Sequence, residues 1–114
     1  MPAINGTMLQ AFHWDYPTGG RLWDEIAADA QALAAAGFTS LWLPSPCKAM
    51  DGASDVGYGI DLYDLGEFDQ KGTVATKYGT RAQLEAAIRA AQGAGLQVYL
   101  DTVLNHKGSA DRPR

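Results

Sequence analysis

Three short apolar stretches alternate along the chain with two stretches of helical spacing. The apolar stretches cover residues 7–14, 38–43 and 96–106, and Gly or Pro residues lie beside them, as is typical of strands. An order of strand, helix, strand, helix, strand predicts parallel strands joined by helical crossovers. The helical positions are Leu22, Ile26, Ala30 and Leu33 in one segment and Leu84, Ala87, Ile88 and Ala91 in the other.

The ends of the predicted helices carry recognisable local chemistry. Gly37 follows the first helix, where glycine is the expected C-terminal stop. Thr80 and Gln83 have the spacing of a capping box at the start of the second helix. Glu85 and Arg89 have the i, i+4 spacing, so we expect an ion pair on the exposed side of that helix.

The second and third apolar stretches echo each other. Residues 36–43 and 94–101 each read as a helix end, a glycine and then a strand. The near-continuous apolar run of the third stretch predicts a strand buried on both faces, the pattern of a parallel sheet. Trp42 lies inside the second stretch and is expected in the core, and Pro44 ends that stretch.

A long segment without helical period separates the second predicted strand from the second predicted helix. It covers residues 44–78, is rich in Gly and Asp, and contains too many aromatic residues for a disordered linker. Loops longer than about 15 residues are uncommon unless they are functional or disordered. This segment is therefore a candidate functional loop.

Polar side chains follow the third apolar stretch within six positions. They are Asp101, Asn105 and His106. In α/β sheets and barrels, ligands bind outside the carboxyl ends of the strands, so these residues predict a site. Strict strand alternation places His106 opposite the other two. If all three face one cleft, the backbone leaves the strand before residue 106.

Composition narrows the possible functions. The chain has 114 residues, with 9 basic and 13 acidic side chains and a formal charge of −4, so it has no basic surface for nucleic acid or anionic lipid. It has no apolar run of about 18 residues that would predict a membrane span. The single cysteine, Cys47, forms no internal disulfide, and residues 1–6 lack the features of a signal peptide. We therefore expect a cytoplasmic location.

Two motifs resemble one enzyme family. Residues 101–106 read D-T-V-L-N-H, which resembles the D-x-V-x-N-H motif of the alpha-amylase family of glycoside hydrolases. Residues 55–74 resemble the V-G-Y-G…D-L-Y-D-L-G-E-F-x-Q-K-G-T-V stretch of bacterial alpha-amylases, although the family usually has one more residue after Gly59. Residues 5–10 and 36–44 are also similar, so the resemblance covers nearly the whole chain.

The resemblance implies a fold and an activity. Residues 1–106 would be the N-terminal portion of a catalytic (β/α)8 barrel, its first three strands and two helices, and residues 107–114 would begin the excursion after strand three. A complete barrel needs about 250 residues, so this one would be incomplete. The family hydrolyses internal α-1,4-glucosidic bonds of starch-like glucans with retention, by carboxylate attack and acid protonation. Its catalytic carboxylates come from strands four, five and seven, so we expect no catalytic residue here.

The resemblance also implies roles for individual residues. Asp101 and His106 would hold a glucosyl unit of the α-1,4-glucan, Tyr58 would stack on a sugar face, and Trp14 would line the same cleft. Asn105 would give one oxygen to a structural Ca²⁺. Calcium takes 6–8 oxygen ligands, so we do not expect this span alone to bind it tightly. The other expected partner is the remainder of the barrel.

A second hypothesis is a stand-alone, non-catalytic module that binds carbohydrate or another partner. Its contacts would be Tyr58, Trp14 and His106. Three parallel strands alone would leave long hydrophobic edges unpaired, which argues against this hypothesis. Asp64 and Glu67 are too close in sequence, with Leu and Gly between them, to suggest a glycosidase acid pair. We expect them to anchor the loop.

Overall fold

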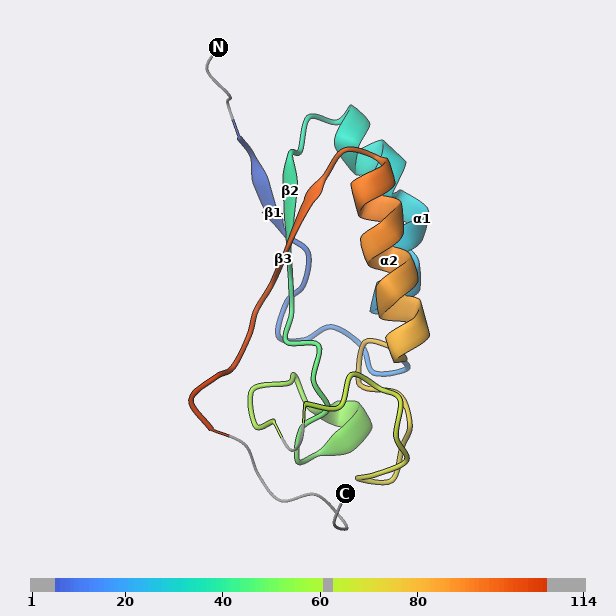
Figure 1. The fold of residues 1–114 in the computed structure, drawn as a ribbon, viewed down its shortest axis with the longest axis vertical. Helices are drawn as coiled ribbons and strands as arrows, with labels where there is room; N and C mark the ends of the chain where they lie inside the picture. Colours follow the sequence, from blue (N-terminus) through green and yellow to red (C-terminus); the bar gives the residue numbers. More distant parts are fainter. Residues whose placement is uncertain (1–5, 61–62, 107–114) are drawn as a thin grey trace.

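A computed structural model describes residues 6–60 and 63–106, which form a parallel sheet beside two helices (Figure 1). The strands are β1 (Met8–Gln10), β2 (Ser40–Leu43) and β3 (Gln97–Leu100), and their order in the sheet is β1-β2-β3. Both pairings are parallel, as predicted. The predicted excursion at 107–114 lies outside the described residues.

The helices cover one face of the sheet. They are α1 (Leu22–Ala35) and α2 (Arg81–Gly93), which pack against each other on the same side of the strands (Figure 1). Leu9, Leu41 and Val98 lie side by side across the three strands, and all three belong to the hydrophobic core or pack against it. This row of side chains therefore joins the sheet to the helical layer.

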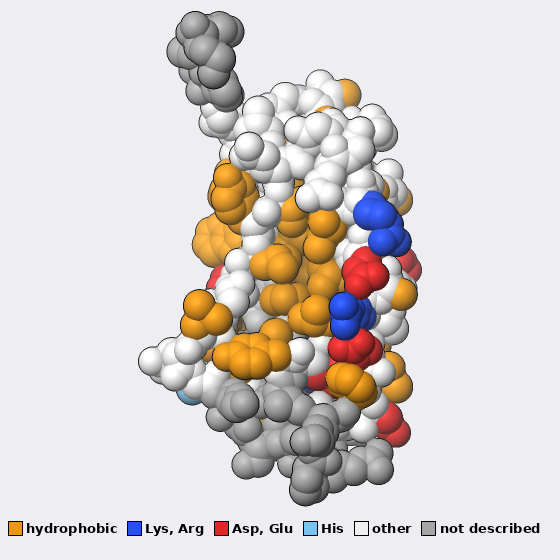
Figure 2. All heavy atoms as spheres, in the orientation of Figure 1, with side chains coloured by type: hydrophobic (Ala, Val, Ile, Leu, Met, Phe, Trp, Pro, Cys, Tyr) orange, Lys and Arg blue, Asp and Glu red, His pale blue; other side chains and the backbone are white. Residues whose placement is uncertain are grey.

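The opposite face of the sheet is exposed, which corrects two predictions. Trp42 is 37% exposed, not a core residue, and Tyr99 beside it in the sheet is 50% exposed. β3 is thus not buried on both faces, because both helices lie on the other side and β2 is its only neighbour in the described chain. Figure 2 shows hydrophobic side chains gathered on the surface between β3 and α2.

The strands are shorter than predicted, and Pro44 explains one end. Proline has no amide hydrogen, so β2 cannot continue its ladder past Leu43. The last rung to β3 joins the Asp101 amide to the Leu43 carbonyl at 3.0 Å. Beyond that rung, residues 102–106 have no adjacent strand in the described structure, and the backbone leaves the sheet before His106.

The capping box at the start of α2 is confirmed. The Thr80 hydroxyl accepts a hydrogen bond from the Gln83 amide, and the Gln83 side chain accepts one from the Thr80 amide. The ion pair of Glu85 differs from the prediction. Glu85 pairs with Arg81, four residues before it, and not with Arg89 after it. Arg81 also forms a salt bridge with Glu67, across the start of the helix.

The long loop folds into a compact body at the carboxyl end of the strands (Figure 1). It contains a short 3-10 helix, Gly52–Ser54, and its segments approach very closely. A Cβ atom on Gly57 would lie 2.7 Å from that of Ser45, so only glycine fits there. Among the described helices, none has the length and apolar character needed to cross a bilayer.

Candidate functional site

Three residues from distant parts of the chain meet beyond the carboxyl end of β3. The Tyr58 hydroxyl, from the long loop, donates a hydrogen bond to Asp101 Oδ2 over 2.7 Å. His106 Nε2 lies 2.9 Å from the Tyr58 backbone oxygen. The loop and the segment after β3 are therefore joined at Tyr58.

The Tyr58 side chain is held as a neutral donor with a partly open ring. Its exposed fraction is 38%. Burial of the hydroxyl raises the pKa of Tyr58, and the hydrogen bond to Asp101 and the charge of that carboxylate raise it further. A phenol that stays protonated keeps its hydrogen bond to the carboxylate. The exposed part of the ring is available for contact with a ligand.

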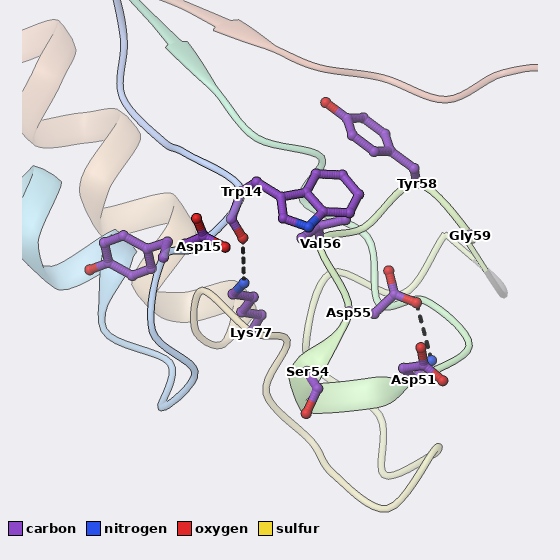
Figure 3. A pocket seen from close by; sticks show the side chains of 10 residues that line it. Trp14, Asp15, Asp51, Ser54, Asp55, Val56, Tyr58, Gly59 and Lys77 are labelled. Atoms are coloured by element: carbon purple, nitrogen blue, oxygen red, sulfur yellow. Dashed lines mark hydrogen bonds between the residues drawn. The ribbon is translucent and has the colours of Figure 1, made fainter.

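Two hollows border this ring. One, of about 530 Å³, lies between the loop that follows β1 and the long loop. The second, of about 310 Å³, lies over the exposed face of the sheet. Trp14 and Tyr58 line both hollows, and Figure 3 shows them in the larger one. The Trp14 side chain is 69% exposed. Aromatic walls with a few polar groups are typical of small-ligand sites.

Polar residues that sequence reasoning missed line the larger hollow. Lys77 is 5% exposed and donates to the Trp14 carbonyl over 3.3 Å, and Asp55 Oδ1 accepts from the Gly57 amide over 2.9 Å (Figure 3). Asp55 precedes the V-G-Y-G run directly, which was a usable signal. A lysine is normally exposed, so the sequence carries no signal that Lys77 is buried in this hollow. Asp15, Asp51 and Ser54 line the same hollow.

The backbone around Tyr58 is fixed on both sides. The buried Ser45 hydroxyl donates to the Gly57 carbonyl over 2.8 Å. On the other side, the Met50 amide donates to the Gly59 carbonyl over 3.1 Å. These two bonds hold the backbone on either side of the Tyr58 ring.

Asp64 and Glu67 anchor the loop, as expected. Asp64 is buried, and its Oδ1 accepts hydrogen bonds from the amides of Gly66 and Glu67 over 2.9 Å and 3.0 Å. Glu67 forms a salt bridge with Arg81 at the start of α2. These contacts hold the two carboxyl groups within the loop and at the helix start, the anchoring role expected for them.

Comparison with known proteins finds close sequence relatives. No family model matches the chain. The curated relatives include an alpha-amylase of Geobacillus stearothermophilus, which is 57% identical over 95% of this chain. They also include a glucan 1,4-alpha-maltohexaosidase of Bacillus sp. (strain 707), 56% identical over 94% of this chain. In sequence, the chain is therefore similar to bacterial alpha-amylases over nearly its whole length.

The chain spans only part of these relatives. It covers 20% of the Geobacillus alpha-amylase and 21% of the Bacillus enzyme, about a fifth of each. Among solved structures, a truncated alternansucrase from Leuconostoc mesenteroides superposes with a TM-score of 0.79 at 25% identity. That match covers 91% of this chain and 10% of the alternansucrase chain. The described part of the chain therefore has the local fold of a much larger enzyme.

The described residues hold no cluster of acidic, histidine or cysteine metal ligands. Within residues 6–60 and 63–106, no group of three or more His, Cys, Asp or Glu side chains is placed to hold a metal ion. Asn105, the residue predicted to bind Ca²⁺, is exposed, and its Nδ2 lies 3.1 Å from His106 Nδ1. A single amide oxygen supplies one of the 6–8 ligands that calcium needs.

Proposed function

We propose that this chain forms the first three strands and two helices of the (β/α)8 barrel of an alpha-amylase. The proposed activity of the longer protein is retaining hydrolysis of internal α-1,4-glucosidic bonds in starch-like glucans. Relatives at 57% and 56% identity named alpha-amylase and glucan 1,4-alpha-maltohexaosidase support it. Because the chain covers about a fifth of them, the activity would belong to the longer protein.

The exposed sheet face supports a closed barrel. Gln10, Trp42 and Tyr99 lie side by side on the face away from the helices. In a (β/α)8 barrel, helices surround the sheet and the inner side chains of all strands pack together. Further strands beside β1 and β3 would cover these side chains and the apolar surface beside β3.

The meeting of Tyr58, Asp101 and His106 is the observation that carries the glucan-binding role. Their bonds, 2.7 Å and 2.9 Å long, form beyond the carboxyl end of β3, where barrel enzymes bind substrate. The ring of Tyr58 would stack on a glucosyl unit, and Trp14 would offer a second aromatic surface. Asp101 and His106 would hydrogen-bond sugar hydroxyls.

The catalytic carboxylates would come from the rest of the barrel. A retaining glycosidase needs two carboxyl groups about 5–5.5 Å apart across the scissile bond. Asp64 is buried under hydrogen bonds and Glu67 is paired with Arg81. We propose that neither takes part, and that Asn105 supplies one calcium ligand within the complete protein.

Titration of the purified chain with maltohexaose, followed by NMR, tests the binding role. We expect signals of Tyr58 and Asp101 to shift, and the shifts to disappear in Tyr58→Ala but persist in Tyr63→Ala. Tyr63 is the matched control because it is a tyrosine of the same loop, 50% exposed. Shifts that persist in Tyr58→Ala would contradict the proposal.

A reducing-end assay on the same samples tests whether this chain carries a catalytic site. With soluble starch and calcium, the chain alone is expected to release no reducing ends above a buffer control. Turnover that Asp101→Asn abolishes would show a complete site in this chain and contradict the assignment of catalysis elsewhere. Binding by a chain that stays monomeric and soluble would instead favour the stand-alone module.

A further inference from the structure

Lys48 is fully buried in the long loop, where it makes three polar contacts. Its exposed fraction is 0%. The ammonium donates to Asp64 Oδ2 over 3.1 Å, to the Thr73 carbonyl over 2.7 Å and to the Phe68 carbonyl. A lysine ammonium has three donors, so each has an acceptor here.

Asp64 is the acidic partner of Lys48 and uses both of its carboxylate oxygens. Its Oδ2 accepts from Lys48 and from Gln70 Nε2 over 3.0 Å, while Oδ1 accepts from backbone amides. Burial opposes ionisation, but hydrogen bonds from Gln70, the amides of Glu67 and Gly66, and Lys48 outweigh it and hold the pKa of Asp64 below its ordinary value. The pair is therefore a buried ionic link between distant parts of the loop.

The backbone carries this link to Tyr58. The Lys48 amide donates to the Asp64 carbonyl over 2.7 Å, so the two residues are joined twice. Immediately after Lys48, Ala49 forms an antiparallel bridge with Ile60, and the Met50 amide binds the Gly59 carbonyl. The segment that follows Lys48 is thus paired with the segment that follows Tyr58.

We propose that Lys48 is a positioning residue for Tyr58, fixing the ring against Asp101 through Asp64 and the 49–60 bridge. Any effect of Lys48 on ligand binding rests on the proposed glucan-binding role of Tyr58. A purely structural role for Lys48 makes a different prediction. Buried ion pairs are often replaceable by apolar residues of similar volume without loss of stability. In that case Tyr58 would keep its position when Lys48 is replaced.

The test compares the Tyr58 environment in variants of the 114-residue chain, labelled with 3-fluorotyrosine. The fluorine signal of Tyr58 is assigned with Tyr58→Phe, and Asp101→Ala gives its position when the hydrogen bond is absent. In Lys48→Met we expect the signal to move toward that of Asp101→Ala. We also expect the Met50 amide to exchange with solvent about a hundredfold faster.

Two further variants keep the test decisive. Leu96→Ala removes a buried core side chain just before β3, at the end of the sheet opposite the long loop, and is expected to leave the Tyr58 signal in place (Figure 1). Asp64→Asn keeps one oxygen for the backbone amides and removes the charged oxygen that accepts from Lys48 and Gln70. It decides the question if Lys48→Met does not fold. A Tyr58 signal at the wild-type position in a folded Lys48→Met or Asp64→Asn chain would overturn the proposal.

The fluorine measurement needs no sugar, which separates this inference from the glucan-binding role. A Tyr58 signal that moves in Lys48→Met, with no maltohexaose binding by the wild-type chain, would refute the glucan role and keep the positioning role. Wild-type binding through Tyr58, with an unmoved signal in Lys48→Met, would refute the positioning role alone.

Discussion

The bond between Tyr58 and Asp101 is the residue-scale centre of the site, and its electrostatics can be measured. Burial, the hydrogen bond and the Asp101 charge raise the pKa of Tyr58 above its ordinary 10.0. Asp101→Asn removes the charge, so we expect the pKa of Tyr58 to fall toward that value in an NMR titration of its ring signals.

A second tyrosine–carboxylate pair provides the matched control. The Tyr16 hydroxyl donates to Glu25, and burial together with this bond raises the pKa of Tyr16 to about 12. Glu25→Gln is expected to lower the pKa of Tyr16 and leave Tyr58 unchanged. A Tyr58 titration that responds equally to both substitutions would contradict a specific link to Asp101.

Asp64 makes the stability of the loop depend on pH. Its pKa is lowered in the folded chain from an ordinary 3.8, so the unfolded chain takes up the proton first as the pH falls. The stability it contributes is fully present above pH 3.8 and is lost as the pH falls through the folded pKa. Urea unfolding should show that the unfolding free energy depends less on pH in the acid range in Asp64→Asn than in the wild-type chain. Equal slopes of unfolding free energy against pH in the two chains would contradict this account.

Sequence alone predicted the polar cluster after β3 but not the contacts that organise it. Asp101 and His106 were identifiable because polar groups at the carboxyl end of a strand suggest a site. The bond from Tyr58 joins residues 43 positions apart, and no local pattern specifies that distance. Lys48 and Lys77 were missed because buried lysines are rare and depend on partners elsewhere in the chain.

At the scale of elements, helix ends were more predictable than strands. Gly37 has a φ of 104°, which glycine adopts without strain, and the Thr80–Gln83 capping box forms as expected. These features depend on neighbouring residues. The length and burial of β3 depend on what packs beside it, and β2 stops pairing at Pro44. Local sequence therefore overestimated the lengths of both strands and the burial of β3.

The capping box gives a direct test at this scale. Thr80→Ala removes the hydroxyl that accepts from the Gln83 amide, and is expected to cost about 1 kcal/mol of unfolding free energy. Arg81→Ala, at the next residue, removes exposed ion pairs and should change stability much less. Urea unfolding of both variants gives the comparison; equal losses would show that the cap contributes nothing specific.

At the scale of the whole molecule, the exposed sheet face and the open edge of β3 predict self-association of the isolated chain. Met8, Trp42 and Tyr99 are exposed, with fractions of 48%, 37% and 50%. Unpaired edge strands and apolar patches promote association. Light scattering should show oligomers whose population falls in Tyr99→Lys. A monomer over the whole concentration range would contradict the incomplete-barrel account.

The most direct test of the central claim is starch hydrolysis by a chimera. In it, this chain replaces the matching fifth of the Geobacillus stearothermophilus alpha-amylase. If the chain supplies the first strands and the glucan-binding side chains of an alpha-amylase barrel, the chimera releases reducing ends from starch. Asp101→Ala in the chimera then lowers kcat/KM strongly, whereas Arg89→Ala, on the exposed side of α2, leaves it unchanged. A folded chimera without activity, or one indifferent to Asp101→Ala, would contradict the claim.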